Sequence, residues 1–185
     1  NRFYERLHLE GAGPETLRER TVGLLGFGRI GQETARLLRP FGPRLLVHDP
    51  YVAVASVRGR GGTPATLDRL LRESEFLVLA AGLTAATRGL IGRAALSRLP
   101  DGATVVNVAR GGIVDLEALT AEVRSRRLRC ALDVTDPLEP LPVRHPLRRM
   151  RGATLTPHVG AAAGLVRRAM ADLVLDALER FFRGE

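Results

Sequence analysis

Three glycines that follow an apolar run could hold a phosphate group. Residues 26–31 read Gly-Phe-Gly-Arg-Ile-Gly and match the pattern G-x-G-x-x-G. In a loop between a strand and a helix, Gly26 would allow a tight turn and Gly28 would let a pyrophosphate approach the backbone. Gly31 would let the helix pack closely on the sheet, and the helix N-terminus would face the anion. The pattern therefore predicts dinucleotide binding, and the alternative is a glycine turn without a ligand.

An aspartate eighteen residues after Gly31 could complete this site. Asp49 follows the apolar run Leu45–His48, which would place it at the end of the second strand. A carboxylate there can accept hydrogen bonds from both ribose hydroxyls of NAD and would repel the 2′-phosphate of NADP. No arginine is adjacent to Asp49, although Arg58 and Arg60 come later. The sequence therefore predicts NAD rather than NADP as the cofactor.

Six short apolar runs, with helical stretches between them, would position these residues. Each run is four to six residues long and is nearly continuous in apolar character. Runs of this kind predict strands that are buried on both faces, as in a parallel sheet. Strands that alternate with helices imply an α/β fold with a Rossmann-like, doubly wound parallel sheet in three α/β/α layers. The expected strands are Thr21–Gly26, Leu45–His48, Phe76–Ala80, Thr104–Val108, Cys130–Val134 and Ala153–Thr156.

Apolar residues at helical spacing mark the stretches between the runs. One stripe follows the glycine loop, a short one is opened by Pro64, and another follows Asp115, which we expect to be an N-cap. The last helix would run from about Ala161 to Arg183. The first twenty residues look helical but irregular, because the segment GAGPE interrupts them.

The composition excludes several kinds of chemistry and partner. All 28 basic residues are arginine, so neither Schiff-base catalysis nor a Walker-type phosphate lysine is available. A single cysteine cannot form an internal disulfide, which favours a cytoplasmic location. No apolar run approaches the roughly 18 residues of a membrane span, so no membrane partner is expected. The net charge of +8 could suggest nucleic acid, but the arginines are scattered and aromatic residues are few, so no nucleic-acid partner is expected either.

Three further segments carry polar residues next to apolar runs. They are Val105–Asp115 (VVNVARGGIVD), Cys130–Leu147 (CALDVTDPLEPLPVRHPL) and Leu155–Ala163 (LTPHVGAAA). Together with GFGRIG and LTAATRGLIGRAAL, these motifs resemble the D-isomer-specific 2-hydroxyacid dehydrogenases, over nearly the whole chain from about Thr21 to Glu185. The resemblance implies the NAD-binding domain of an oxidoreductase that interconverts a small 2-oxo acid and its D-2-hydroxy acid.

The resemblance also implies a catalytic set of Arg110, Glu139 and His158. Arg110 matches the arginine that binds the substrate, and a planar guanidinium can hold the carboxylate of a 2-oxo acid through two hydrogen bonds. His158 matches the proton donor, since an imidazole can give a proton to the carbonyl oxygen and take it back in the reverse reaction. Glu139 matches the acid beside this histidine, where a carboxylate fixes the tautomer of the ring and favours its charged form.

The resemblance further places groups of residues around the cofactor. Arg29 and Ile30 would lie at the pyrophosphate, and Val108, Ala109 and Asp133 around the nicotinamide. No metal site is expected. The full set of expected cofactor-binding residues is Gly26, Gly28, Arg29, Ile30, Gly31, Asp49, Ala81, Val108, Ala109, Arg110, Asp133, His158 and Gly160.

Two local departures from the family pattern bear on these expectations. Leu138 makes the spacing between Asp133 and Glu139 one residue longer than usual, so a bulge must absorb it or the carboxylate will miss His158. Ala80 and Gly82 stand where the family commonly has histidine and proline, in a loop that would border the cofactor.

The substrate domain of the family comes largely from residues that precede the cofactor domain and are absent from this sequence. We therefore expect residues 1–20 to form a helical segment that crosses to that domain, and residues 21–185 to form the NAD-binding domain. The resemblance implies a homodimer. Two other functions stay open, namely a non-catalytic NAD-sensing module of the corepressor type and, more weakly, a nucleic-acid binder.

Overall fold

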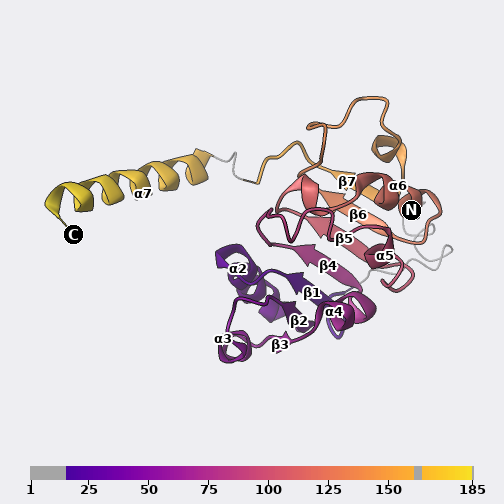
Figure 1. Ribbon diagram of the computed structural model, residues 1–185, viewed down its shortest axis with the longest axis horizontal. Helices are drawn as coiled ribbons and strands as arrows, with labels where there is room; N and C mark the ends of the chain where they lie inside the picture. Colours follow the sequence, from indigo (N-terminus) through magenta and orange to yellow (C-terminus); the bar gives the residue numbers. More distant parts are fainter. Residues whose placement is uncertain (1–15, 161–163, 185) are drawn as a thin grey trace, which may run out of the picture.

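The computed structural model describes residues 16–160 and 164–184, in which a seven-stranded parallel sheet forms the centre of the molecule (Figure 1). The strand order is β3-β2-β1-β4-β5-β6-β7, and all neighbouring strands are parallel. The Rossmann-like, doubly wound α/β fold expected from the alternation of strands and helices is therefore confirmed. The strands are β1 (Thr21–Leu25), β2 (Arg44–His48), β3 (Thr63–Pro64), β4 (Phe76–Leu79), β5 (Thr104–Asn107), β6 (Arg129–Leu132) and β7 (Ala153–Leu155).

Helices connect the strands and flank the sheet (Figure 1). The α-helices are α2 (Arg29–Leu38), α3 (Val54–Gly59), α4 (Leu67–Glu73), α5 (Arg93–Leu96), α6 (Leu116–Arg124) and α7 (Gly164–Arg183). Three short 3-10 helices are η1 (Arg39–Phe41), η2 (Gly111–Ile113) and η3 (Pro146–Arg149).

Six strands lie within one or two residues of the bounds expected from the apolar runs. The prediction missed β3, because this strand has two residues and one of them is Pro64, which a sheet tolerates at an edge. Pro64 therefore does not open the next helix as expected. Helix α4 begins at Leu67 after the N-cap Thr66, whose hydroxyl accepts a hydrogen bond from the Arg69 amide at 3.2 Å.

The described residues cover only part of the expected first and last helical segments. Residues 1–15 of the segment expected to be helical lie outside the described residues. Its described part, residues 16–20, forms a turn in which the Arg20 amide donates to the Leu17 carbonyl at 3.1 Å. The last helix is described over Gly164–Arg183, and its expected start at Ala161 lies outside the described residues.

Alternation along the strands sends side chains to two apolar clusters, one on each face of the sheet. Val22 and Leu24 of β1 belong to the cluster that contains Ala35 of α2 and Val57 of α3. The larger cluster on the other face contains side chains of β4 and β5 together with those of α4, α5 and α6. Burial on both faces explains the continuous apolar runs in the sequence.

One half of the sheet is less well covered on the face that α2 and α3 occupy. Phe76 and Val78 of β4, Val106 of β5 and Ala131 of β6 share this face and are only half-buried. Figure 1 shows α7 projecting away from the sheet, and its described side chains are exposed.

The order of the strands reverses at β1, which lies between β2 and β4. Because all the strands are parallel, the loops that follow β1, β2, β4, β5 and β6 leave from the same edge of the sheet. In open α/β sheets, ligands bind at this edge next to the point of reversal.

Close packing of α4 on β1 leads to a test of this arrangement. A methyl group added at Gly23 would lie 2.0 Å from Oγ of Ser74, which is fully buried. We expect Gly23→Ala to lower the free energy of unfolding by about 2 kcal/mol, because the helix must move to relieve the overlap. Urea denaturation measures this change.

Gly59→Ala is the matched control, because no atom lies within 4 Å of the added methyl group at the end of α3. Its effect should be neutral or stabilising by up to about 1 kcal/mol. Equal stabilities of the two variants would contradict the packing described for β1 and α4.

Candidate active site

The glycine loop has the shape that an approaching anion requires. Gly26 has φ +94°, and an added Cβ there would lie 2.6 Å from the Ala81 amide nitrogen. An added Cβ at Gly31 would lie 2.3 Å from the Gly26 carbonyl oxygen, so the start of α2 is held against the end of β1. At Gly28, by contrast, no atom lies within 4 Å of an added Cβ. The space outside Gly28 is therefore open to a phosphate group, next to the N-terminus of α2.

Asp49 lies half-buried directly after β2, at the same edge of the sheet. One carboxylate oxygen accepts a hydrogen bond from the Phe27 amide at 2.7 Å, and the other accepts from the Tyr51 amide at 2.9 Å. The first bond ties Asp49 to the glycine loop, which the sequence did not indicate. Each oxygen keeps a further lone pair that a ribose hydroxyl could use.

A hollow of about 560 Å³ adjoins the glycine loop. It lies between the start of α2 and the loops that follow β4 and β5, and its volume is in the range of small-molecule sites. Ala80 and Gly82, the two small residues that depart from the family pattern, both line this hollow. The full lining is Ile30, Ala80, Ala81, Gly82, Leu83, Val108, Ala109 and Arg110.

The turn that carries Arg110 is fixed by a buried asparagine. Asn107, which is 1% exposed, donates a hydrogen bond from its side chain to the Arg110 carbonyl at 3.0 Å and accepts one from the Ala109 amide at 3.1 Å. Arg110 itself is exposed, and its guanidinium donates to the Ala109 carbonyl at 2.7 Å. Asn107 was not selected from the sequence, although a polar residue at the end of the apolar run TVVN was the available signal.

Asp133 organises the segment that follows β7. Its Oδ1 accepts hydrogen bonds from the Thr156 hydroxyl at 2.5 Å and the Val159 amide at 3.0 Å, and its Oδ2 accepts one from the Gly160 amide at 3.1 Å. The Thr156 hydroxyl is the main cause of a pKa below the usual range for the Asp133 carboxyl, with further contributions from the two amides. The carboxylate thus stays charged and holds both sides of His158 in place.

His158 and Glu139 lie in direct contact within this segment. Nδ1 of His158 is hydrogen-bonded to Oε1 of Glu139, and the His158 amide donates to the Asp133 carbonyl at 2.9 Å. The His158 side chain is 48% exposed, so the nitrogen Nε2 can meet a ligand from the open side. Its backbone has φ +52°, a conformation that histidine adopts more readily than most residues.

The additional residue Leu138 does not separate Glu139 from His158. The Thr135 hydroxyl donates to the Leu138 carbonyl at 2.6 Å, which closes the segment into a turn. Because the turn absorbs the additional residue, the Glu139 carboxylate still reaches His158.

The turn of Arg110 and the loop of Glu139 are in contact through their backbones. A Cβ added at Gly111 would lie 2.2 Å from the Thr135 carbonyl carbon. Gly111 directly follows Arg110, and Thr135 begins the turn that leads to Glu139. The structure therefore joins the loops that carry all three expected catalytic residues.

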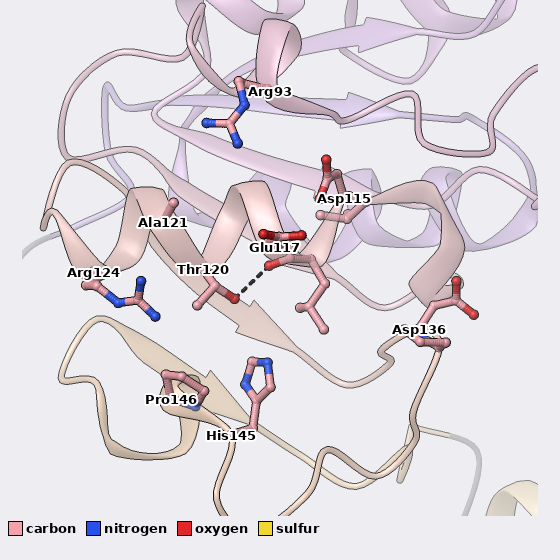
Figure 2. Close-up of a pocket in the computed structure, with 12 residues that line it drawn as sticks. Arg93, Asp115, Glu117, Thr120, Ala121, Arg124, Asp136, His145 and Pro146 are labelled. Atoms are coloured by element: carbon pink, nitrogen blue, oxygen red, sulfur yellow. Dashed lines mark hydrogen bonds between the residues drawn. The ribbon is translucent and has the colours of Figure 1, made fainter.

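A separate hollow of about 600 Å³ lies between α6 and the segment before η3, as Figure 2 shows. Its lining includes Glu117, Arg124 and His145, and none of the expected catalytic residues. His145 accepts a hydrogen bond from the Leu147 amide at 3.4 Å and so caps η3, which is a structural role.

Two other kinds of feature are absent from residues 16–160 and 164–184. No group of three or more histidine, cysteine, aspartate or glutamate side chains there could hold a metal ion. No helix in these ranges is both long and apolar enough to span a membrane.

Comparison with known proteins shows which family this chain resembles. Residues 6–160 match the family described as D-isomer specific 2-hydroxyacid dehydrogenase, NAD binding domain. The glyoxylate reductase/hydroxypyruvate reductase of Homo sapiens is 35% identical over 175 residues, which cover 91% of this chain and 52% of that protein. The chain thus spans about half the length of the curated relatives it matches.

Two solved structures extend the comparison to bound cofactors. The NAD-dependent formate dehydrogenase of Staphylococcus aureus, in complex with NAD, is 34% identical, with a TM-score of 0.83 over 97% of this chain and 53% of that one. A D-isomer specific 2-hydroxyacid dehydrogenase of Xanthobacter autotrophicus, in complex with NADPH and MES, is also 34% identical, with a TM-score of 0.80 over 99% of this chain and 76% of that one.

The hydrogen bonds of Asp133 predict a pH-dependent change in this segment. The pKa of this carboxyl is lower in the folded chain, so its contribution to stability is complete above the ordinary value of about 3.9 and is lost as the pH falls through the lowered value. In an NMR titration, the Gly160 amide shift should follow this protonation. Thr156→Val should raise its midpoint, because the hydroxyl donor is removed.

Thr154→Val, at an exposed position in β7, is the matched control and should leave the midpoint unchanged. A midpoint that is the same in the Thr156 and Thr154 variants would show that the hydroxyl does not set the pKa of Asp133.

Proposed function

This chain belongs to the D-isomer specific 2-hydroxyacid dehydrogenase family through its NAD-binding domain, and on that premise we propose that it is the cofactor domain of an NAD-dependent oxidoreductase. The reaction proposed is the interconversion of a small 2-oxo acid and its D-2-hydroxy acid. The contact between Glu139 and His158, at the edge of the sheet that carries the glycine loop, is the observation that carries this proposal.

The substrate class rests on the names of the relatives and on the residues present. Glyoxylate and hydroxypyruvate, after which the human relative is named, are small 2-oxo acids. Their carboxylate suits the guanidinium of Arg110, which is exposed at the rim of the 560 Å³ hollow. Residues 21–185 would supply the cofactor half of the cleft, and a substrate domain would supply the other half.

The residues at the glycine loop fit a nicotinamide dinucleotide. The open space at Gly28 and the amides at the start of α2 would hold its pyrophosphate, with Arg29 and Ile30 beside it. Asp49 would accept the hydroxyls of its adenosine ribose, and Val108 would lie at its nicotinamide. When bound there, the dinucleotide supplies or accepts the hydride of the reaction.

Three side chains would perform the remaining chemistry. Arg110 would bind the substrate carboxylate and orient the carbonyl group, using the turn that Asn107 fixes. His158 would donate a proton from Nε2 to the carbonyl oxygen, and in the opposite direction would remove the proton from the hydroxyl group. Glu139 would hold the imidazole through Nδ1 and stabilise its charged form.

The proposal extends to the assembly and location of the protein. A homodimer is supported by the large apolar side chains that the chain exposes, such as Leu173 (67%) and Phe182 (81%) of α7, since such surfaces commonly bind a partner. A cytoplasmic location is supported by Cys130, the single cysteine of the sequence, which is a free thiol.

The carboxylate of Asp49 predicts a preference between cofactors. We expect the chain to bind NADH more tightly than NADPH, because a 2′-phosphate would meet this negative charge. Asp49→Asn keeps the size of the side chain, removes the charge and should narrow the preference by about tenfold. Fluorescence titration of both cofactors measures it.

Asp136→Asn is the control, since this exposed aspartate lies outside the proposed cofactor contacts. Equal or tighter binding of NADPH by the unaltered chain would contradict the assignment to NAD.

The proposed roles of Arg110 and His158 predict different kinetic losses. In a fusion that adds the substrate domain of a relative, Arg110→Ala should mainly raise KM for the 2-oxo acid. His158→Ala should mainly lower kcat, by about a hundredfold or more, because positioned proton transfer is lost. Glu139→Gln should also lower kcat. Arg144→Ala is the control, since Arg144 lies in an exposed loop, and it should change neither KM nor kcat. Steady-state reduction assays measure these effects.

Unchanged turnover after His158→Ala would remove the proposed mechanism. Tight cofactor binding by a fusion that turns over no 2-oxo acid would instead favour an NAD-sensing module.

A further inference from the structure

The loop after β4 forms one wall of the 560 Å³ hollow and lies against two other parts of the proposed site. At its start, the Ala81 amide nitrogen lies 2.6 Å from a Cβ added at Gly26 of the glycine loop. Two residues later, the Leu83 side chain lies 3.2 Å from a Cβ added at Gly112, in the 3-10 helix that follows Arg110. The loop thus connects the glycine loop to the turn of Arg110 along one wall of the hollow.

Gly82, between these two contacts, is not held in place by packing. No atom lies within 4 Å of a Cβ added there, and its φ is outside the left-handed region, so neither space nor backbone conformation requires a glycine. Within the described part of the chain, its one hydrogen bond is the one that its carbonyl accepts from the Thr87 hydroxyl at 2.7 Å. Because Gly82 lines the hollow, this bond fixes the shape of a surface that a ligand would meet.

The Thr87 hydroxyl uses its full hydrogen-bonding capacity within this loop. A hydroxyl has one proton to donate and two lone pairs that can accept. That of Thr87 donates to the Gly82 carbonyl, accepts from the Thr84 amide at 2.8 Å, and lies 3.2 Å from the Thr84 hydroxyl. Since the proton of Thr87 goes to Gly82, the Thr84 hydroxyl must be the donor in the last contact. One oxygen atom therefore joins both ends of the loop.

The segment after Thr87 is fixed independently of this hydroxyl. The Gly89 amide donates to the Gly112 carbonyl at 2.8 Å, and the Ile91 amide donates to the Ile113 carbonyl at 3.0 Å. Both bonds tie the segment to η2, next to the turn of Arg110. We therefore expect loss of the Thr87 hydroxyl to release Gly82 without moving η2.

A released loop would bind the proposed cofactor less well for two reasons. The hollow adjoins the glycine loop, where the negatively charged pyrophosphate would lie, and a carbonyl oxygen is the negative end of the peptide dipole. A Gly82 carbonyl without its donor could turn toward that charge and oppose binding. A loop that must first be ordered also loses more entropy when the ligand binds.

We propose that Thr87 is a positioning residue, which holds residues 81–83 in the conformation that binds the nicotinamide dinucleotide. Thr87 is not part of the lining of the hollow, so it acts through Gly82 rather than by contact with the ligand. This inference rests on the proposed function, because the dinucleotide is the ligand proposed for the hollow.

Fluorescence titration of the full chain with NADH compares three variants. Thr87→Val keeps the size of the side chain, removes the hydroxyl, and should raise the Kd about fivefold, as expected for one lost hydrogen bond. Thr87→Ser keeps the hydroxyl and should retain the affinity of the unaltered chain. Thr66→Val is the matched control, since this hydroxyl also accepts from a backbone amide, that of Arg69, but caps α4 and does not line the hollow. It should lower the temperature of unfolding and leave the Kd unchanged.

Hydrogen exchange of the Thr84 amide, measured by NMR without cofactor, tests the contact itself. Exchange should become faster in Thr87→Val, because the acceptor of this amide is lost, and should be unchanged in Thr66→Val. Thermal unfolding checks that all three variants fold.

Two results would overturn this inference and leave the proposed function intact. One is an unaltered chain that binds NADH no more tightly than Thr87→Val does. The other is a loss of affinity in Thr87→Ser as large as that in Thr87→Val, which would show that the hydroxyl is not the cause. If the unaltered chain does not bind NADH at all, the proposed function fails and this inference fails with it.

Discussion

The position of His158 depends on three hydrogen bonds that the Asp133 carboxylate accepts from the segment after β7. Asp133 directly follows β6, and its amide donates to the Asn107 carbonyl at 3.0 Å, so its backbone is held at the end of the sheet. The Thr156 hydroxyl stabilises its charge. The left-handed backbone conformation of His158, with φ +52°, would cost free energy in a loop without other contacts. The hydrogen bonds to Asp133 offset that cost. The hydrogen-bonded pair of His158 and Glu139 is therefore held by a group that does not itself take part in the pair.

Close approaches of backbone bring the remaining parts of the site together. Gly26 meets the loop after β4, Gly31 meets Gly26, and Gly111 meets the loop after β6, each at a distance that leaves no room for a side chain. The contacts of Gly26 and Gly111 join loops that are far apart in the sequence but leave the same edge of the sheet. The loops of the site thus pack on one another at these three glycines, while at Gly28 and Gly82 no atom lies within 4 Å of an added Cβ and the backbone is open to a ligand.

The sequence predicted the parts of the structure that depend on local patterns. Continuous apolar runs located six strands, glycine spacing located the loop after β1, and the motifs around Arg110 and His158 indicated the family that the comparison with known proteins confirmed. Long-range contacts could not be predicted in this way. The bond from the Phe27 amide to Asp49 and the half-exposed face around Val106 depend on how distant elements pack, and no single motif encodes them.

The turn closed by Thr135 and Leu138 has a consequence for how such proteins can diverge. Its ends are fixed, one by the close approach of Gly111 to Thr135 and the other by the bond from Glu139 to His158. Between these two points the chain is exposed, so a residue gained or lost there should change the size of the turn more than the place of the carboxylate. We therefore expect the length of this turn to tolerate change better than the positions of its two anchored ends, Thr135 and Glu139.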